Sequence, residues 1–289
     1  MSNFVIVTES TTDLSPEMIE EFGLAVLPLQ YQIGEDTYLD KVGGGLSQVE
    51  FYNKLRGGAS ATTSQIAPAI FEEEFEKILK EGKDILYVGF SSGLSGTYNS
   101  ACIAKDLLAD KYPDRKIFCV DTLAASMGEG LYAYYAYRMR EEGKSIEEIA
   151  AWLEENKLKL CMWFTVDDLN HLKRGGRVSP TVAFVGTLLG IKPVLHVDDE
   201  GHLINVSKVR GRKAALDALV DQMKATAIKP EEQVVFISHG DCLEDAEYVA
   251  AQIKEKLGVP DIKINFIGPV IGAHSGPGTV ALFFYGSKR

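Results

Sequence analysis

A glycine- and hydroxyl-rich stretch, residues 89–101, joins an apolar run to a helical pattern. Ile85-Leu86-Tyr87-Val88 precedes it, and apolar residues follow it with helical spacing up to Leu108. The first N–H groups of such a helix lack intrahelical partners and lie at the positive end of the helix dipole, so they favour an anion. The stretch therefore predicts an anion site where a strand turns into a helix. A plain helix cap formed by Ser95 or Thr97 is the alternative.

The order of strand and helix patterns predicts the fold class. Apolar runs at 4–7, 24–32, 85–88 and 116–120 alternate with helical patterns, which predicts a three-layer α/β/α domain with a mostly parallel sheet over residues 1–158. In residues 159–289 a turn at 198–202 separates two strand patterns, which favours antiparallel pairing and a mixed sheet. The length of 289 residues suits two such α/β domains.

A second hydroxyl cluster, 59–65, contains Thr62 and Thr63 and precedes a helical pattern at 68–80. We expect it to be a turn after a strand of the same parallel sheet, beside the first glycine-rich turn at the carboxyl edge. Both turns would then contact the polar head group of one ligand. Ser10 follows the first strand, where it would either support the ligand or simply form a turn.

Composition and charge exclude several classes of protein. The formal net charge of −11 argues against nucleic acid or an anionic membrane surface as a main partner. No apolar run approaches the ~20 residues that span a bilayer, and the N-terminal residues do not read as a signal peptide, so we expect a cytoplasmic protein without stable membrane insertion. The four cysteines and five histidines show no metal-ligand spacing, so neither a metal nor a disulfide is predicted.

Basic residues gather at two places in the second half. Arg174 and Arg177 flank a pair of glycines, and Arg210 and Arg212 open a helical pattern where cations oppose the helix dipole. We expect an anionic group, either a neighbouring acid or a partner, to compensate the second pair. His274 lies in a loop of glycines and prolines, 268–279, where it could donate to an anion or be an ordinary turn histidine.

Six segments together resemble the DegV family, in the family's order and over nearly the whole chain. They are Val7-Thr8-Glu9-Ser10-Thr11, Thr62-Thr63-Ser64-Gln65, Ser91-Ser92-Gly93-Leu94-Ser95-Gly96-Thr97-Tyr98, Lys173-Arg174-Gly175-Gly176-Arg177, Lys208-Val209-Arg210-Gly211-Arg212-Lys213 and 268–278. The resemblance implies a lipid-binding protein that holds a long-chain fatty acid such as palmitate in an interior tunnel near the domain junction. It also implies no cofactor and no catalysis by this chain, which would present the carboxyl group to a separate fatty acid kinase for acyl phosphate formation.

The resemblance also implies roles for individual residues. Thr63 and Ser95 would bind the carboxylate. A secondary head-group shell would comprise Thr62, Ser92, Gly96, Ser10 and His274. Docking of the kinase would involve Arg174, Arg177, Arg210 and Arg212. Two departures from the family pattern are Glu9, where aspartate is common, and Ile66-Ala67, where a proline-containing turn is common. Candidates for the tunnel wall are 182–191 and Phe266-Ile267.

Two enzymatic alternatives remain open at this point. Gly89-Phe90-Ser91-Ser92-Gly93 matches the G-x-S-x-G nucleophile elbow, so Ser91 with Asp241 and His274 could form a serine hydrolase triad. A stand-alone phosphotransferase is the other alternative, because the resemblance extends at fold level to dihydroxyacetone kinases. The sequence has neither a G-x-x-x-x-G-K-[ST] loop nor an acidic cluster suited to magnesium.

Overall fold

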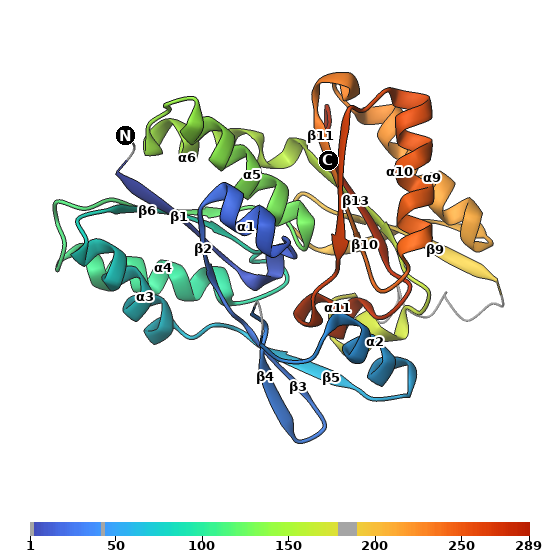
Figure 1. The fold of residues 1–289 in the computed structure, drawn as a ribbon, viewed down its shortest axis with the longest axis horizontal. Coiled ribbons are helices and arrows are strands. Elements are labelled where there is room, and N and C mark those ends of the chain that lie inside the picture. Colours follow the sequence, from blue (N-terminus) through green and yellow to red (C-terminus); the bar gives the residue numbers. More distant parts are fainter. Residues whose placement is uncertain (1–2, 42–43, 179–189) are drawn as a thin grey trace.

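Three β-sheets organise the chain, as the computed structural model shows (Figure 1). The structure describes residues 3–41, 44–178 and 190–289. A parallel sheet and a mixed sheet lie on opposite sides of the molecule in Figure 1, and a small antiparallel sheet lies below them. The two larger sheets confirm the predicted α/β class, with a parallel sheet in the first half and a mixed sheet in the second.

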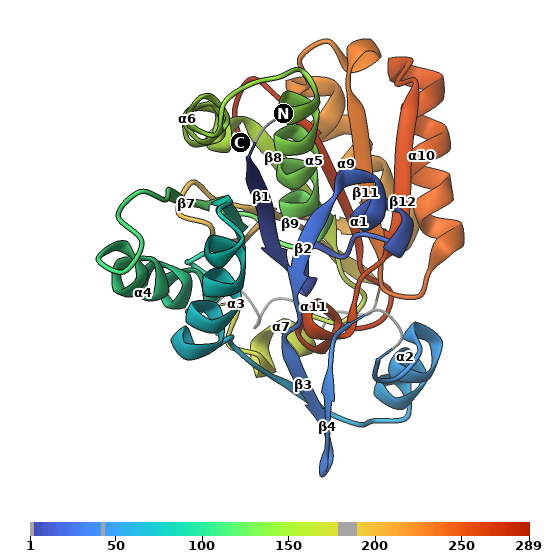
Figure 2. The same cartoon turned by 60° about the vertical axis from the view of Figure 1, so that its left-hand side comes forward.

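The first sheet has the strand order β2-β1-β6-β7, and all its pairings are parallel. Alternating side chains of its strands enter different cores: Ile85 and Tyr87 pack with one set of helices, whereas Leu86 and Val88 pack with another. Helices therefore cover both faces (Figure 2), as predicted. The strands are β1 (Phe4–Glu9), β2 (Leu24–Leu27), β6 (Asp84–Gly89) and β7 (Ile117–Asp121). The helices are α1 (Pro16–Phe22), α3 (Pro68–Lys80), α4 (Thr97–Ala109), α5 (Met127–Glu141) and α6 (Ile146–Asn156).

The expectation of one strand over residues 24–32 is wrong. The segment breaks after Leu27, and Gln30 begins a strand of the small antiparallel sheet, whose order is β4-β3-β5. Pro28 accounts for the break, because proline has no N–H to donate to a continuing ladder. The elements here are β3 (Gln30–Ile33), β4 (Asp36–Leu39), β5 (Ala61–Ser64) and α2 (Gln48–Arg56).

The mixed sheet has the order β10-β9-β8-β13-β11-β12, in which only the β11–β12 pairing is parallel. One face packs against α9 and α10 through residues such as Trp163 and Leu282. The other face carries Met162 and Phe283 and turns toward α5. Its strands are β8 (Leu160–Thr165), β9 (Ile191–Val197), β10 (Leu203–Arg210), β11 (Val234–His239), β12 (Asp261–Phe266) and β13 (Val280–Tyr285). The helices are α7 (Asn170–Arg174), α9 (Arg212–Thr226), α10 (Leu243–Leu257) and α11 (Pro269–Ser275).

Helix α11 occupies a segment that the glycines and prolines of 268–279 predicted to be a loop. The helix begins with Pro269 at its first position, which proline favours because its missing N–H has no partner there anyway. Gly276 ends it with φ of 77°, a conformation that glycine adopts without strain. The prediction of a loop was wrong for seven residues, and His274 is consequently held on a helix.

Buried polar contacts join the first half of the chain to the second. Gly268 donates its N–H to Asp13 Oδ1 at 2.8 Å, Ser126 Oγ lies 2.9 Å from Ser238 Oγ, and Tyr52 donates to the carbonyl of Ile267 at 2.8 Å. The division into 1–158 and 159–289 stays a prediction, since these contacts cross it and β8 begins just after it at Leu160.

None of the described helices has the length and apolar character that crossing a membrane requires.

Candidate functional site

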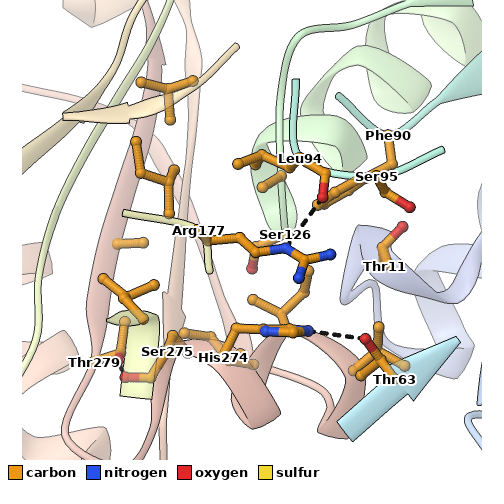
Figure 3. A pocket seen from close by; sticks show the side chains of 18 of the residues that line it. Thr11, Thr63, Phe90, Leu94, Ser95, Ser126, Arg177, His274, Ser275 and Thr279 are labelled. Carbon is orange, nitrogen blue, oxygen red and sulfur yellow. Dashed lines mark hydrogen bonds between the residues drawn. The ribbon is translucent and has the colours of Figure 1, made fainter. Parts of the chain in front are cut away.

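A cavity of about 250 Å³ lies where segments from all three sheets meet. Residues that follow the strands of the parallel sheet line one side, β5 and α11 line another, and β8, β9, β10 and β13 of the mixed sheet line the third. Figure 3 shows the polar side chains Thr11, Thr63, Ser95, Arg177 and His274 converging on the same space. The carboxyl edge of the parallel sheet therefore borders the cavity, as expected for ligand sites in α/β proteins.

Thr63 and His274 are in direct contact at one end of this cavity. His274 Nε2 lies 2.8 Å from Thr63 Oγ1, and either atom can supply the proton. Burial, followed by the positive charge of Arg177, lowers the pKa of His274 to about 4, so the imidazole is neutral at pH 7. Its Nδ1 is buried without a hydrogen-bond partner in the described part of the chain. If Nε2 carries the proton, it donates to Thr63, which leaves the threonine hydroxyl proton free for a ligand.

Ser95 reaches the same cavity from the start of α4. Its Oγ lies 2.9 Å from Thr97 Oγ1 and accepts from the Thr97 N–H at 3.3 Å. The second hydroxyl cluster, residues 59–65, packs closely against Gly96. A Cβ at position 96 would lie 2.2 Å from Gln65 Oε1, so the missing side chain allows this approach. The two hydroxyl segments therefore converge as predicted. The expected reason was wrong, however, since Thr63 lies in an antiparallel strand and not in a turn of the parallel sheet.

Arg177 is the one charged side chain among the described residues that line the cavity. Its Nε donates to the carbonyl of Leu94 at 3.1 Å and its Nη1 donates to the carbonyl of Gly175. Among the described residues its other N–H groups have no acceptor, so they can serve a ligand. Gly175 is needed for a steric reason, because a Cβ there would lie 2.2 Å from His274 Nδ1. We call Thr63, Ser95, Arg177 and His274 the polar end of the cavity.

The rest of the cavity wall is mainly apolar. Side chains of one face of the mixed sheet supply much of it, and the rest comes from α7, α11 and the segments that follow β2, β6, β7 and β12. The apolar residues are Leu29, Phe90, Leu94, Ala125, Met162, Phe164, Leu172, Val197, Leu203, Ile267, Val270, Ile271, Ala281 and Phe283. Of the candidates for the tunnel wall, Ile267 lines the cavity and Phe266 does not. Positions 182–189 of the other candidate segment lie outside the described residues.

Buried carboxyl groups lie directly behind the cavity wall. Glu129 accepts from Thr11 at 2.9 Å, Glu9 accepts from the N–H of Phe90 at 2.9 Å, and Asp13 accepts from Ser126. Burial raises the pKa of Glu9 to about 8 and raises the pKa values of Asp13 and Glu129 well above their ordinary range. Glu9 is therefore largely protonated at pH 7, and the raised pKa values of Asp13 and Glu129 also favour their neutral forms, which lowers the negative charge that the wall presents to an anion in the cavity.

Five hydroxyl residues on this wall were not predicted as site residues from the sequence. They are Thr11, Ser64, Ser126, Ser275 and Thr279. Thr11 belongs to the segment already singled out after the first strand, where the prediction named its neighbour Ser10. Ser10 instead accepts from the N–H of Leu29 at 3.1 Å and does not line the cavity. Because adjacent residues of a short turn point in different directions, the sequence alone could not choose between Ser10 and Thr11.

A second cavity, of about 310 Å³, adjoins the polar end of the first. Thr63, Arg177 and His274 line both cavities, while Thr62, His171 and Arg174 line only the second. Arg174 Nη2 lies 2.9 Å from His171 Nδ1 at the exposed rim. The second cavity therefore connects the polar end with a basic, solvent-exposed surface.

The other predicted site residues lie elsewhere. Ser92 is exposed, and its N–H donates to Asp121 Oδ1 at 3.2 Å. Arg210 is exposed on β10, and neither Arg210 nor Arg212 lines either cavity. Arg212 pairs with Asp245 at 2.8 Å and with Asp167 at 3.6 Å. The expected compensation by neighbouring acids is therefore confirmed for Arg212, whereas no ion pair joins Arg210 to the described residues.

The residues of the alternative hydrolase site are engaged in other contacts. Ser91 is fully buried and donates its hydroxyl proton to the carbonyl of Gly201 at 2.9 Å. Asp241 forms an ion pair with Arg56, and His274 contacts Thr63. The hydroxyl proton of Ser91 is thus directed to a backbone carbonyl. Within residues 3–41, 44–178 and 190–289, no group of three or more His, Cys, Asp or Glu side chains is placed to hold a metal ion.

Comparisons with known proteins agree with this architecture. A family profile described as "Uncharacterised protein, DegV family" matches residues 3–287. A DegV domain-containing protein of Clostridium perfringens is 50% identical over 289 residues, covering 100% of this chain and 99% of that relative. The crystal structure of a DegV lipid binding protein from Thermotoga maritima superposes with a TM-score of 0.87 at 31% identity, over 100% of both chains. A DegV family protein from Thermus thermophilus, described for its fatty acid binding, gives 0.86 at 32% identity over 98% of this chain and 99% of its own. This chain therefore belongs to the DegV family.

Proposed function

We propose that this protein binds a long-chain fatty acid, with the acyl chain in the apolar part of the first cavity and the carboxylate at the polar end. The observation that carries the proposal is the division of one cavity into an apolar wall and a single group of converging donors. Solved relatives described as lipid-binding or fatty-acid-binding support the ligand class.

The energetics of binding a fatty acid fit the division of the cavity into an apolar wall and a polar end. Burying an acyl chain is favourable by about 0.8 kcal/mol per CH₂, so the tail supplies most of the affinity. A buried carboxylate is costly unless several donors meet it. Thr63 and Ser95 hydroxyls are the proposed direct ligands, with the guanidinium of Arg177 as the cation, and His274 would orient Thr63. Gly96, which lines the first cavity, and Thr62, which lines the second, are the proposed supporting shell, whereas Ser10 and Ser92 line neither cavity.

We further propose that the protein presents the bound carboxylate to a separate kinase. A carboxylate at Thr63 would border the second cavity, which opens beside Arg174 and His171. A carboxylate oxygen would attack the terminal phosphorus of the nucleotide held by the kinase, forming an acyl phosphate and releasing the nucleoside diphosphate. Arginine suits this place because its planar fork matches phosphate oxygens. Arg174 and Arg177 are therefore the proposed docking residues nearest the chemistry, with Arg210 and Arg212 at the periphery.

The decisive experiment identifies the ligand. The protein is isolated under native conditions, its bound lipid is extracted and analysed by mass spectrometry, and the delipidated protein is titrated with palmitate. Recovery of intact fatty acid and saturable binding are the expected results. A delipidated protein that binds no fatty acid would overturn the proposal. Covalent labelling of Ser91 by a serine-reactive phosphonate would instead favour the hydrolase alternative.

A further inference from the structure

A row of apolar side chains runs across the strands of the mixed sheet, on the face that lines the first cavity. Phe283 of β13 pairs with Met162 of β8, and Leu203 of β10 pairs with Val197 of β9. The antiparallel register between β8 and β9 continues the row from Met162 to Val197. All four side chains line the cavity. The row therefore forms one continuous strip of the cavity wall.

Along β13 the cavity wall begins near the polar end and stops at Phe283. Thr279, just before the strand, donates its hydroxyl proton to the carbonyl of Ser275 at 3.0 Å, on the helix α11 that contributes to the polar end. Ala281 and Phe283 line the cavity, whereas Tyr285, the next residue on this face, does not. A rise of about 3.4 Å per residue places Phe283 about 14 Å beyond Thr279. Phe283 is therefore the part of this strand wall farthest from the polar end.

The space beyond Phe283 is filled by packed side chains. The ring centroid of Tyr285 lies 6.2 Å from that of Tyr135 on α5 and 6.3 Å from that of Trp152 on α6. On the neighbouring strand, Leu160 lies opposite Tyr285 and is buried in the core that contains Tyr135 and Trp152. None of these four residues lines the cavity. Solid packing therefore closes the cavity behind Phe283.

The β10 end of the row lies close to the proposed carboxylate site. The turn at 198–202 joins β9 to β10 and leads into Leu203, the β10 member of the row. Ser91, in the segment that carries Ser95, donates its hydroxyl proton to the carbonyl of Gly201 in this turn at 2.9 Å. The β13 end of the row is thus the end remote from the proposed carboxylate ligands.

A glycine of α5 lies directly against the β13 end of the row. Helix α5 lies between the parallel sheet and the mixed sheet (Figure 1). A Cβ at Gly128 would lie 2.8 Å from Phe283 Cδ1 and 2.9 Å from Met162 Sδ. Both side chains therefore have the helix on one side and the cavity on the other. A methyl group added at position 128 would push them into the cavity, because the free space lies on that side.

We propose that Met162 and Phe283, backed by Gly128, form the end wall of the acyl cavity and set the longest chain that the protein accommodates. The inference rests on the proposed fatty acid function and assigns the methyl end of the chain to this wall. Each further CH₂ group raises the affinity by about fourfold until the chain reaches the wall. A longer chain must displace a packed side chain or hold its carboxylate away from the polar end, so its affinity falls.

The test measures how affinity depends on chain length in the delipidated protein. Wild type is titrated with saturated fatty acids from laurate to behenate, and its affinity should rise to an optimum and then fall. Gly128→Ala should lower the affinity for the optimal and longer acids by about tenfold or more, and change that for laurate by less than about twofold. Phe283→Ala should move the optimum to a longer acid, because it removes the ring from the wall.

Gly130→Ala is the matched control, because it adds the same methyl group on the same helix. A Cβ at Gly130 would lie 2.8 Å from Leu14 Cδ2, and Leu14 does not line the cavity. Its chain-length profile should follow that of the wild type. An unchanged profile in either Gly128→Ala or Phe283→Ala would overturn the inference and leave fatty acid binding intact, as would an equal shift in Gly130→Ala. A wild type that binds no acid of any length would overturn the proposed function itself.

Photolabelling of the unmodified chain keeps the inference testable if a variant does not fold. An analogue of the best-bound acid, with a diazirine at its methyl end, is bound and irradiated, and the labelled residues are mapped by mass spectrometry. The label should fall on Met162, Phe283 or the first turn of α5. Label confined to the turn at 198–202 and Leu203 would place the methyl end at the opposite end of the row and overturn the inference. Labelling that excess unmodified acid does not reduce would count against the proposed function instead.

Discussion

Thr63 Oγ1 and His274 Nε2 lie 2.8 Å apart, although 211 positions separate the two residues in the sequence. The contact joins the small antiparallel sheet to α11, and it places a neutral imidazole behind the hydroxyl that faces the cavity. The proposed carboxylate site thus depends on how these distant segments pack. Four predictions test this geometry and its surroundings.

Replacing both Thr63 and Ser95 by alanine should weaken fatty acid binding. A hydrogen bond to a charged group contributes about 1.5–3 kcal/mol, so each lost hydroxyl should lower the affinity by roughly tenfold to a hundredfold. Calorimetric titration of the delipidated proteins measures this. Ser92→Ala is the matched control, because Ser92 belongs to the same segment as Ser95 but is exposed and lines neither cavity, so its effect should be small. Undiminished affinity in the double variant would exclude the proposed head-group site.

Gly175→Ala should lower the affinity through His274. The added Cβ would lie 2.2 Å from His274 Nδ1, so the ring must move, and overpacking of this kind costs about 1–3 kcal/mol. The affinity should therefore fall by about tenfold. A double-mutant cycle provides the control: in a His274→Ala background the collision is absent, and Gly175→Ala should then have little further effect. Equal effects in both backgrounds would show that the collision is not the cause.

Arg174 and Arg177 should differ in their effect on acyl phosphate formation. Arg174 lines only the second cavity, so Arg174→Ala should slow phosphorylation by an acyl-phosphate-forming kinase and leave fatty acid affinity almost unchanged. Arg177 lines both cavities, so Arg177→Ala should lower phosphorylation strongly and affinity to a smaller extent. The exposed Arg138 on α5 lines neither cavity, which makes Arg138→Ala the control. Wild-type turnover in both variants would remove the docking role.

Glu9 should make the wild type less stable as the pH rises. Its folded-state pKa is raised to about 8 from 4.5, so between these values the folded state retains a proton that the unfolded chain has lost. The free energy of unfolding therefore falls with rising pH in this window, by up to about 1.4 kcal/mol per pH unit for one proton. Glu9→Gln removes this titration.

Urea unfolding of both proteins from pH 4.5 to pH 8 measures the Glu9 effect. The stability of Glu9→Gln relative to wild type should rise steadily across the window, because other titrating groups act equally on both proteins. The exposed Glu20→Gln variant is the control and should follow the wild type. Parallel profiles for wild type and Glu9→Gln would contradict the prediction.

Several features could be read from the sequence because they depend on neighbouring residues. The strands at 4–9 and 84–89 are apolar runs, and α2 and α6 begin with capping boxes at Ser47 and Ser145, which satisfy the first N–H groups locally. Thr63 and Ser95 stood out as hydroxyls beside predicted helix starts, and both line the cavity. The break at Pro28 and the helix at His274 were missed, because a single proline or a glycine-rich segment is compatible with more than one local structure.

The order of residues by itself determined the alternation of strands and helices, the family membership and the hydroxyl segments, since each depends on local spacing and on contiguous motifs. Only the tertiary structure decided that Thr63 meets His274, that Arg177 points into the cavity, and that Glu9, Asp13 and Glu129 lie buried behind it. The physical reason is range. Backbone hydrogen bonding and hydrophobic periodicity act over a few residues, whereas burial, pKa values and convergence of donors depend on contacts between segments a hundred or more residues apart.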